Sequence, residues 1–195
     1  MEELIKLDAY PIRGLVGRLL QDKTTRKNIM FASDSYTDYG AEYRDNSQMT
    51  EGVLLGFDSC DIQPRVYKAA AEQTERTRKR AEVFTPAWIV NQMNNHCDAE
   101  WFGRADVFNH QEGQEWTVST DPVTFPEGKD WKQYVDSRRL EITCGEAPYI
   151  VSRYDTSTGE IIPIERRIGI LDRKLRIVNE NAADEAEWFK WAFRA

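Results

Sequence analysis

A phenylalanine-threonine-proline turn is the first segment of this 195-residue sequence whose residue types fit ligand chemistry. Thr85 has a side chain typical of a helix N-cap, and Pro86 suits the first helical residue after it. The unpaired amides of such a helix start, together with the helix dipole, favour a carboxylate or a phosphate. Because most capped helices bind no ligand, this segment by itself predicts only a helix that begins after Thr85.

A second segment, residues 138–151, has the pattern of a strand, a turn and a helix. Leu140 to Thr143 alternates apolar and polar residues and includes β-branched ones, which predicts a short strand. Gly145 permits a tight turn, and Pro148 fits the first turn of a following helix. Ligands of open α/β sheets bind at the carboxyl ends of strands, so this turn is a candidate pocket for adenosine or methionine.

Together the two segments resemble the opening of an adenine-specific DNA methyltransferase of a restriction-modification system. The run Glu82-Val83-Phe84-Thr85-Pro86 is similar to the family's first cofactor motif. Residues 140–149 are similar to its second motif, although a glutamate, an alanine and a proline replace a more flexible glycine turn. The resemblance extends over nearly the whole chain and includes the methylation subunits of such systems.

The resemblance implies that the chain binds S-adenosylmethionine and methylates the amino group of adenine in DNA. Phe84 would pack on the cofactor, and Thr85 with backbone amides would bind its carboxylate. Glu141 to Gly145 would line its methionine or adenosine portion. The candidate cofactor-binding residues are therefore Phe84, Thr85, Pro86, Glu141, Thr143, Cys144 and Gly145.

The fold implied is α/β, a partial doubly wound, Rossmann-like methyltransferase domain over residues 81–195, with a long loop at 99–131. A mainly helical amino-terminal region, residues 1–80, would precede it. The family's catalytic tetrapeptide, Asn or Asp followed by Pro-Pro and Tyr or Phe, does not occur in the sequence. No catalytic residue is therefore assigned, and we expect a truncated or split enzyme that is inactive until a carboxyl-terminal portion or a second chain completes it.

The distribution of charge bears on the expected DNA partner. The formal net charge is -7, which does not suit a self-sufficient DNA-binding body. One basic run, however, could meet phosphates, and its alternative is a solvated helix face paired with nearby glutamates. The candidate nucleic-acid-binding residues in this run are Arg76, Arg78, Lys79 and Arg80.

Two alternative functional interpretations of the sequence remain open. The first is a non-catalytic module, a remnant or split subunit that binds DNA or a partner chain. The second, weaker one is a metal-dependent restriction-type nuclease, because the run Ile170 to Lys174 has the form of a nuclease metal site with Asp172 as one ligand. That run has a helical pattern. The spacing of cysteines and histidines fits no zinc site, so we predict no metal.

Composition limits the class of protein. A chain with 41% hydrophobic residues can bury a core, and it contains no apolar run of membrane-spanning length. Three widely separated cysteines suit a reducing compartment, so we expect a cytoplasmic protein without membrane contact.

The remaining elements follow from periodicity and turn residues. We expect aromatic residues near the carboxyl end to exceed what one core can bury, leaving an apolar patch for a partner. The predicted elements are helices at 12–21, 66–80, 86–95, 166–181 and 185–194, a strand at 28–33, a loop at 33–48 and a hairpin turn at 155–159.

Overall fold

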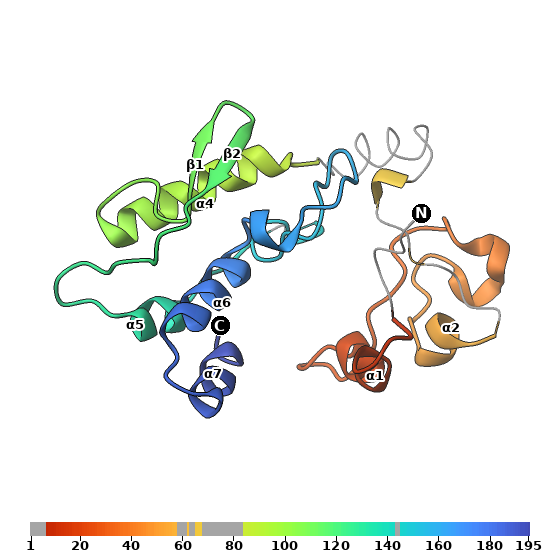
Figure 1. The fold of residues 1–195 in the computed structure, drawn as a ribbon. Helices are drawn as coiled ribbons and strands as arrows, with labels where there is room; N and C mark the ends of the chain where they lie inside the picture. Colours follow the sequence, from red (N-terminus) through yellow and green to blue (C-terminus); the bar gives the residue numbers. More distant parts are fainter. Residues whose placement is uncertain (1–6, 58–61, 63–64, 68–83, 143–144) are drawn as a thin grey trace. The chain divides into compact units, whose positions relative to one another are not determined.

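The structure, a computed structural model, describes residues 7–57, 62, 65–67, 84–142 and 145–195. The chain divides into two compact units, Met1–Pro64 and Arg65–Ala195 (Figure 1). The predicted boundary between residues 80 and 81, and most of the predicted helix at 66–80, lie outside the described residues. Only a 3-10 helix at Arg65–Tyr67 is described there.

The first unit is built from short elements around a small core. A 3-10 helix at Ile12–Leu15 continues into α1, Val16–Leu20, and α2 spans Glu51–Leu55. The Thr50 side chain caps α2 by accepting a hydrogen bond from the backbone amide of Val53. The buried residues shared by these elements are Val16, Leu20, Phe31, Tyr43 and Leu54.

The predicted helix at 12–21 is confirmed in a shorter and mixed form, whereas the strand expected at 28–33 is not formed. Two isolated antiparallel bridges, Gln21 with Asn28 and Met30 with Gln48, take its place. A regular strand needs a long neighbour for its ladder, and the segment opposite turns away after each bridge. The expected loop beyond it contains 3-10 turns at Thr37–Tyr39 and Ala41–Tyr43.

The described part of the second unit places four α-helices and a hairpin around two apolar clusters. Figure 1 shows β1 and β2 alongside α4, while α6 runs beside α5 and α7. The larger cluster joins α4, α5 and α6 through Phe102, Phe108, Tyr134 and Ile177. The elements are α4 (Ala87–Phe102), β1 (Asn109–Glu112), β2 (Glu115–Val118), α5 (Trp131–Asp136), a 3-10 helix (Ile164–Arg166), α6 (Ile170–Asn181) and α7 (Glu185–Ala192).

Helix α4 follows the phenylalanine-threonine-proline turn as expected, but both of its ends differ from the prediction. Its N-cap is Pro86 rather than Thr85, and no side chain of the cap residue accepts a hydrogen bond. The helix continues past the polar residues at 94–95 and ends at Gly103, whose φ of 70° closes it in the left-handed conformation. Those polar residues do not end the helix because their side chains are satisfied by neighbouring elements.

The loop expected at 99–131 contains regular structure. Its first residues complete α4, and β1 pairs antiparallel with β2 so that Glu112 lies opposite Glu115. Gly113, with a φ of 61°, makes the two-residue turn between them possible. The segment thus forms a hairpin that packs on α4, and only the residues around it are irregular.

The segment that was expected to form a strand and a helix forms neither within the described residues. Leu140 and Ile142 are 82% and 73% exposed, and no strand lies beside them in the described part of the chain. Gly145 does occupy a turn, with a φ of 51°, but Ala147 is also left-handed, so the chain turns again where a helix was expected. Residues 84–142 and 145–195 hold one two-stranded antiparallel sheet and no parallel strands, so the doubly wound architecture stays a prediction.

The two carboxyl-terminal helices are present as predicted, with shorter bounds. The tryptophans of α7 are half-buried, because Trp188 and Trp191 pack against the larger cluster, and the ring centres of Trp131 and Trp191 lie 5.4 Å apart. Phe189 and Phe193 remain 47% and 89% exposed and stack on each other. The expectation of an excess of exposed aromatic surface therefore holds for the two phenylalanines and is wrong for the two tryptophans.

Candidate functional site

The start of α4, where a ligand anion was expected, already holds an anion from the chain itself. The backbone amide of Ala87 donates to the Asp155 carboxylate at 2.7 Å. Asp155 belongs to the predicted hairpin turn, which is present: Tyr154 bridges to Ile161, and Asp155 accepts from the amide and hydroxyl of Ser157. A ligand carboxylate at this helix start would have to displace Asp155.

The two segments that carry the family resemblance meet at the start of α4. The Thr85 carbonyl accepts from the Thr156 hydroxyl at 2.8 Å. Tyr149 packs against the cluster of Ala87, and its phenol donates to Met93 Sδ at 3.1 Å. Asn94 on α4 adds a second tie, because its Nδ2 donates to the carbonyls of Tyr149 and Ile168, each at 3.0 Å. The turn before α4 and the residues after Gly145 are therefore neighbours.

Some of the other candidate cofactor residues lie at this junction, and two lie outside the described residues. Phe84 and Pro86 are half-buried beside Thr85. The Glu141 carboxylate accepts from the amide of Ile150 at 3.2 Å, which ties it to the residues after the turn. Gly145 has open space where a Cβ would stand. Thr143 and Cys144 lie outside the described residues, so the floor of the expected pocket is not described.

Several acids and a phenol at this junction have shifted pKa values. Burial raises the pKa of the Glu141 and Asp172 carboxyls and of the Tyr149 phenol. Asp155 is also partly buried, but hydrogen bonds from Ser157, Ala87 and Thr158 outweigh that burial and lower its pKa. The region thus combines one well-stabilised carboxylate with two carboxyls whose charge is poorly solvated.

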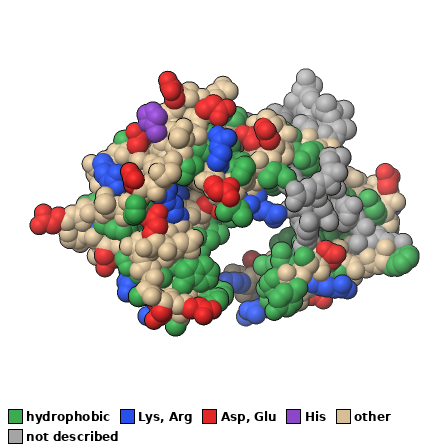
Figure 2. Space-filling model, in the orientation of Figure 1, with side chains coloured by type: hydrophobic (Ala, Val, Ile, Leu, Met, Phe, Trp, Pro, Cys, Tyr) green, Lys and Arg blue, Asp and Glu red, His purple; other side chains and the backbone are tan. Residues whose placement is uncertain are grey.

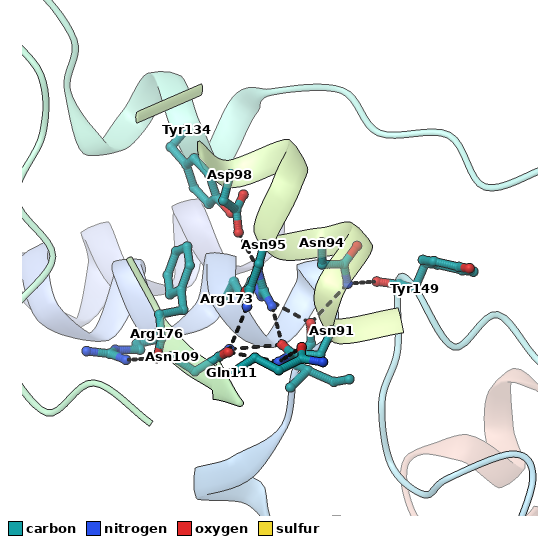
Figure 3. A network of polar contacts seen from close by, with 12 residues as sticks. Asn91, Asn94, Asn95, Asp98, Asn109, Gln111, Tyr134, Tyr149, Arg173 and Arg176 are labelled. Atoms are coloured by element: carbon teal, nitrogen blue, oxygen red, sulfur yellow. Dashed lines mark hydrogen bonds and ion pairs between the residues drawn. The ribbon is translucent and has the colours of Figure 1, made fainter. Parts of the chain in front are cut away.

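The most extensive polar cluster is a buried network on the opposite side of α4 from solvent (Figure 3). An ion pair lies at its centre: Arg173 Nη1 on α6 donates to Asp98 Oδ2 on α4 at 2.5 Å, and both side chains are at most 2% exposed. Asp98 Oδ1 accepts from the Tyr134 phenol at 2.7 Å. Burial raises the pKa of that phenol well above its ordinary value, so it stays a donor.

The amide side chains of α4 extend this network to β1. Asn91 and Asn109 form two reciprocal hydrogen bonds of 2.8 and 2.9 Å, and Arg173 Nη2 donates to Asn91 Oδ1 at 2.8 Å. Asn95 also donates to Asn109, at 2.9 Å. These bonds position α4, β1 and α6 relative to one another. Arg139 lies beside the network, 3.9 Å from Asp98, and its buried Nε and Nη2 make no hydrogen bond to any described residue.

Sequence analysis missed this network, although a signal for it exists. Asn91, Asn94, Asn95 and Asp98 recur at intervals of three, four and seven residues, which places them on one helix face. Polar residues with that spacing can form a buried polar face if a cation on another element packs against them. Without this periodicity, Asn94 and Asn95 favour turns, and they mark the end of the helix predicted at 86–95.

The run that resembles a nuclease metal site lies in α6, and its side chains face different elements. Arg173 pairs with Asp98, and Lys174 donates to the carbonyls of Ser137 and Ala195 at 2.9 and 3.1 Å. Asp172 instead lies close to Gly169, at the start of the helix. Within the described ranges no three His, Cys, Asp or Glu side chains gather as metal ligands would.

The basic residues expected to contact nucleic acid, Arg76, Arg78, Lys79 and Arg80, all lie outside the described residues. In the part of the chain that is described, no helix has both the length and the apolar character needed to cross a membrane. Comparison of the chain with protein-family models, with curated proteins and with solved structures finds no match.

Proposed function

We propose that this chain is the cofactor-binding part of an adenine-specific DNA methyltransferase of restriction-modification type. In this proposal S-adenosylmethionine binds at the junction of Thr85 and Tyr149, and methyl transfer requires residues of a completing portion or partner chain. The adenine would be flipped out of the DNA duplex so that its amino nitrogen can take the methyl group from the sulfonium and lose a proton.

One observation carries the proposal: Tyr149 of the second stretch packs against the apolar cluster that contains Ala87, directly after Pro86 of the first. The two stretches that resemble the cofactor motifs are more than fifty residues apart in the sequence, and they could have lain on opposite sides of the unit. Their contact supports a shared site, because a cofactor that spans both motifs needs them within one ligand's length.

The charges of the junction also fit part of the cofactor. S-adenosylmethionine carries a sulfonium and an ammonium group, and Glu141, Asp155 and Asp172 provide carboxyl groups around residues 149–155. Opposite charges at such short range favour binding. The cofactor's carboxylate is less easily placed, because Asp155 occupies the α4 amide that would otherwise receive it.

The test is calorimetric titration of the full chain with S-adenosylmethionine. We expect saturable binding that Thr85→Val weakens about fivefold, since one hydrogen bond is worth roughly 1 kcal/mol net. Thr117→Val on β2 is the matched control, because Thr117 is exposed and β2 belongs to a hairpin remote in sequence from both motifs. Absence of binding, or equal loss in both variants, overturns the proposal.

The second candidate is a non-catalytic module that binds DNA or a partner chain. The specific observation in its favour is that the anion site at α4 is filled by Asp155 and that the side chains of the buried network bond one another. A chain that binds duplex DNA but not S-adenosylmethionine would establish this alternative. In either case we propose a cytoplasmic protein, on the basis of its few, widely separated cysteines.

A further inference from the structure

The turn that follows α1 in the first unit is fastened by one carboxylate. Asp22 Oδ1 accepts hydrogen bonds from the amides of Thr24 and Thr25, at 3.0 and 2.5 Å, and from the Thr25 hydroxyl at 2.8 Å. The amide of Asp22 donates to the Lys27 carbonyl at 2.9 Å, which closes the turn on the other side. The backbone of residues 22–27 is therefore held in one shape by its own groups.

This fastened turn presents three cations to solvent. Lys23, Arg26 and Lys27 are exposed, as is Arg18 on α1 just before the turn. None of the four forms an ion pair in the described part of the chain. Arg26 has a φ of 60°, an uncommon conformation for this residue type, which the bonds of its backbone amide to the Asp22 carbonyl and of Gln21 to its own carbonyl help to maintain.

The charge of the turn is opposite to that of the chain. Residues 13–33 contain five cations and one carboxylate, a net +4, in a molecule whose net charge is -7. The one carboxylate, Asp22, points inward to the turn's amides. Figure 2 shows Lys and Arg side chains beside hydrophobic ones at the lower edge of the first unit, where this turn lies in Figure 1.

Among the acids of the same unit, Glu51 lies against α1, where it accepts from the amide of Gly17 at 2.8 Å. Four others are in the stretch 34–45, which follows the bridged residues Asn28 to Phe31. Figure 1 shows that stretch at the other end of the unit from the turn. Five cations therefore outnumber the carboxylates Asp22 and Glu51 at this end of the unit, and both carboxylates already accept from backbone amides.

We propose that the turn Asp22–Lys27 binds the phosphate backbone of duplex DNA through Lys23, Arg26 and Lys27. A narrow, rigid turn with cations along it can follow a phosphate strand without reading bases. Exposed apolar side chains flank the turn, namely Leu19, Ile29 and Met30, so binding to an anionic membrane is the contrary outcome that the vesicle measurement tests.

The choice of DNA rests on the proposed methyltransferase function, but the phosphate contact does not involve the cofactor junction. For three phosphate contacts, counterion release predicts a slope of about -2.7 in log affinity against log salt concentration. Between 50 and 200 mM salt those contacts alone lower affinity roughly 40-fold, since the slope multiplies a fourfold change in salt.

The experiment measures binding of the full chain to a fluorescein-labelled 20-base-pair duplex by anisotropy at several salt concentrations. The variant Lys23→Gln with Arg26→Gln and Lys27→Gln is expected to bind more weakly and to make the salt slope shallower by about 2.7. The control variant Arg44→Gln with Arg153→Gln and Lys190→Gln removes the same charge from other exposed sites and is expected to leave the slope unchanged.

A second variant separates the shape of the turn from its charge. Asp22→Ala removes a negative charge, which would strengthen binding if only net charge mattered. We expect it to weaken binding, because the turn loses the acceptor that holds its amides. Equal effects of the two triple variants, stronger binding by Asp22→Ala, or binding to phosphatidylserine vesicles but not to the duplex would each overturn the inference.

The outcomes distinguish this inference from the proposed function. Titration with S-adenosylmethionine reports on the junction of Thr85 and Tyr149 and is expected to be unchanged in the turn variants. If the chain binds the cofactor and the turn variants leave its DNA affinity unchanged, only the proposed role of the turn is refuted. If the chain binds DNA through the turn but does not bind the cofactor, only the proposed methyltransferase function is refuted.

Discussion

Asp155 is the residue whose replacement most directly tests how the candidate site is built. Its carboxylate accepts from Ala87 N at 2.7 Å, from Ser157 N at 2.7 Å and from Thr158 N at 3.2 Å. In Asp155→Ala the Ala87 amide loses its partner within a buried residue, which costs about 1–3 kcal/mol. The exposed amides of the turn can bond water instead, so we expect a total loss of roughly 2–3 kcal/mol in the free energy of unfolding.

Urea unfolding followed by tryptophan fluorescence is a suitable assay, because all six tryptophans lie in the second unit. Asp184→Ala is the matched control. Asp184 caps α7 through the amide of Glu187 at 2.8 Å, but that helix start is exposed, so its loss is expected to cost only about 1 kcal/mol. A loss below about 0.5 kcal/mol in Asp155→Ala would refute the view that Asp155 holds the start of α4.

The stabilisation that Asp155 provides should depend on pH in a direction that its pKa shift fixes. The folded protein lowers the pKa of Asp155, so its ionised form stabilises the fold above the carboxyl's unfolded pKa. That contribution is lost as pH falls through the lower, folded pKa. The difference in stability between the wild type and Asp155→Asn should therefore be full near neutral pH and shrink below about pH 4. A difference that does not vary with pH would show that the charge is irrelevant.

The same variant indicates which end of the cofactor faces α4. If the carboxylate of S-adenosylmethionine binds the Ala87 amide, Asp155→Ala removes a competitor and should raise the cofactor's affinity. If the cationic groups bind near Asp155, the variant should lower that affinity. Calorimetric titration of the folded variant, below its unfolding transition, distinguishes the two orientations.

Two further predictions concern packing. Arg173→Met is expected to cost about 3 kcal/mol, because the buried Asp98 loses its hydrogen-bonded cation and keeps only Arg139, 3.9 Å away. Adding Asp98→Leu should recover part of the loss, and an effect near zero in urea unfolding would contradict the buried pair. Phe189→Ser with Phe193→Ser should change the free energy of unfolding by less than about 0.5 kcal/mol and reduce any self-association seen by light scattering. Trp191→Ser should cost about 2 kcal/mol, because Trp191 packs against the larger cluster. A larger loss in the phenylalanine variant than in Trp191→Ser would contradict the exposure of these rings.

Local signals in the sequence predict the helices and turns of the second unit better than its sheet. The hairpin turn beginning at Asp155 and the helix containing Asp172 are present because their turn residues and periodicity act within a few neighbouring residues. The strand expected at Leu140 depends on a neighbour, and none lies beside it in the described part of the chain. Strand formation requires a ladder that a short alternating pattern cannot supply alone.

The interior of α4 shows why the candidate site was predicted only in part. An apolar face through Met93 was expected, but Met93 is 51% exposed and the buried face carries Asn91, Asn94 and Asp98. Burying these groups is tolerated because Arg173 arrives from α6, eighty residues later, to satisfy two of them. Such long-range pairing cannot be read from the periodicity of one helix.

The hydrogen bond from Ala87 to the Asp155 carboxylate is also a contact between residues far apart in the sequence. It changes what the phenylalanine-threonine-proline turn can be taken to predict. A helix start preceded by threonine and proline predicts an anion, and the chain supplies that anion from a hairpin almost seventy residues away. The motif therefore does not distinguish an internal carboxylate from a ligand. What favours a ligand here is the separate packing of Tyr149 against the cluster of Ala87, since capping the helix does not require the two resembling segments to meet.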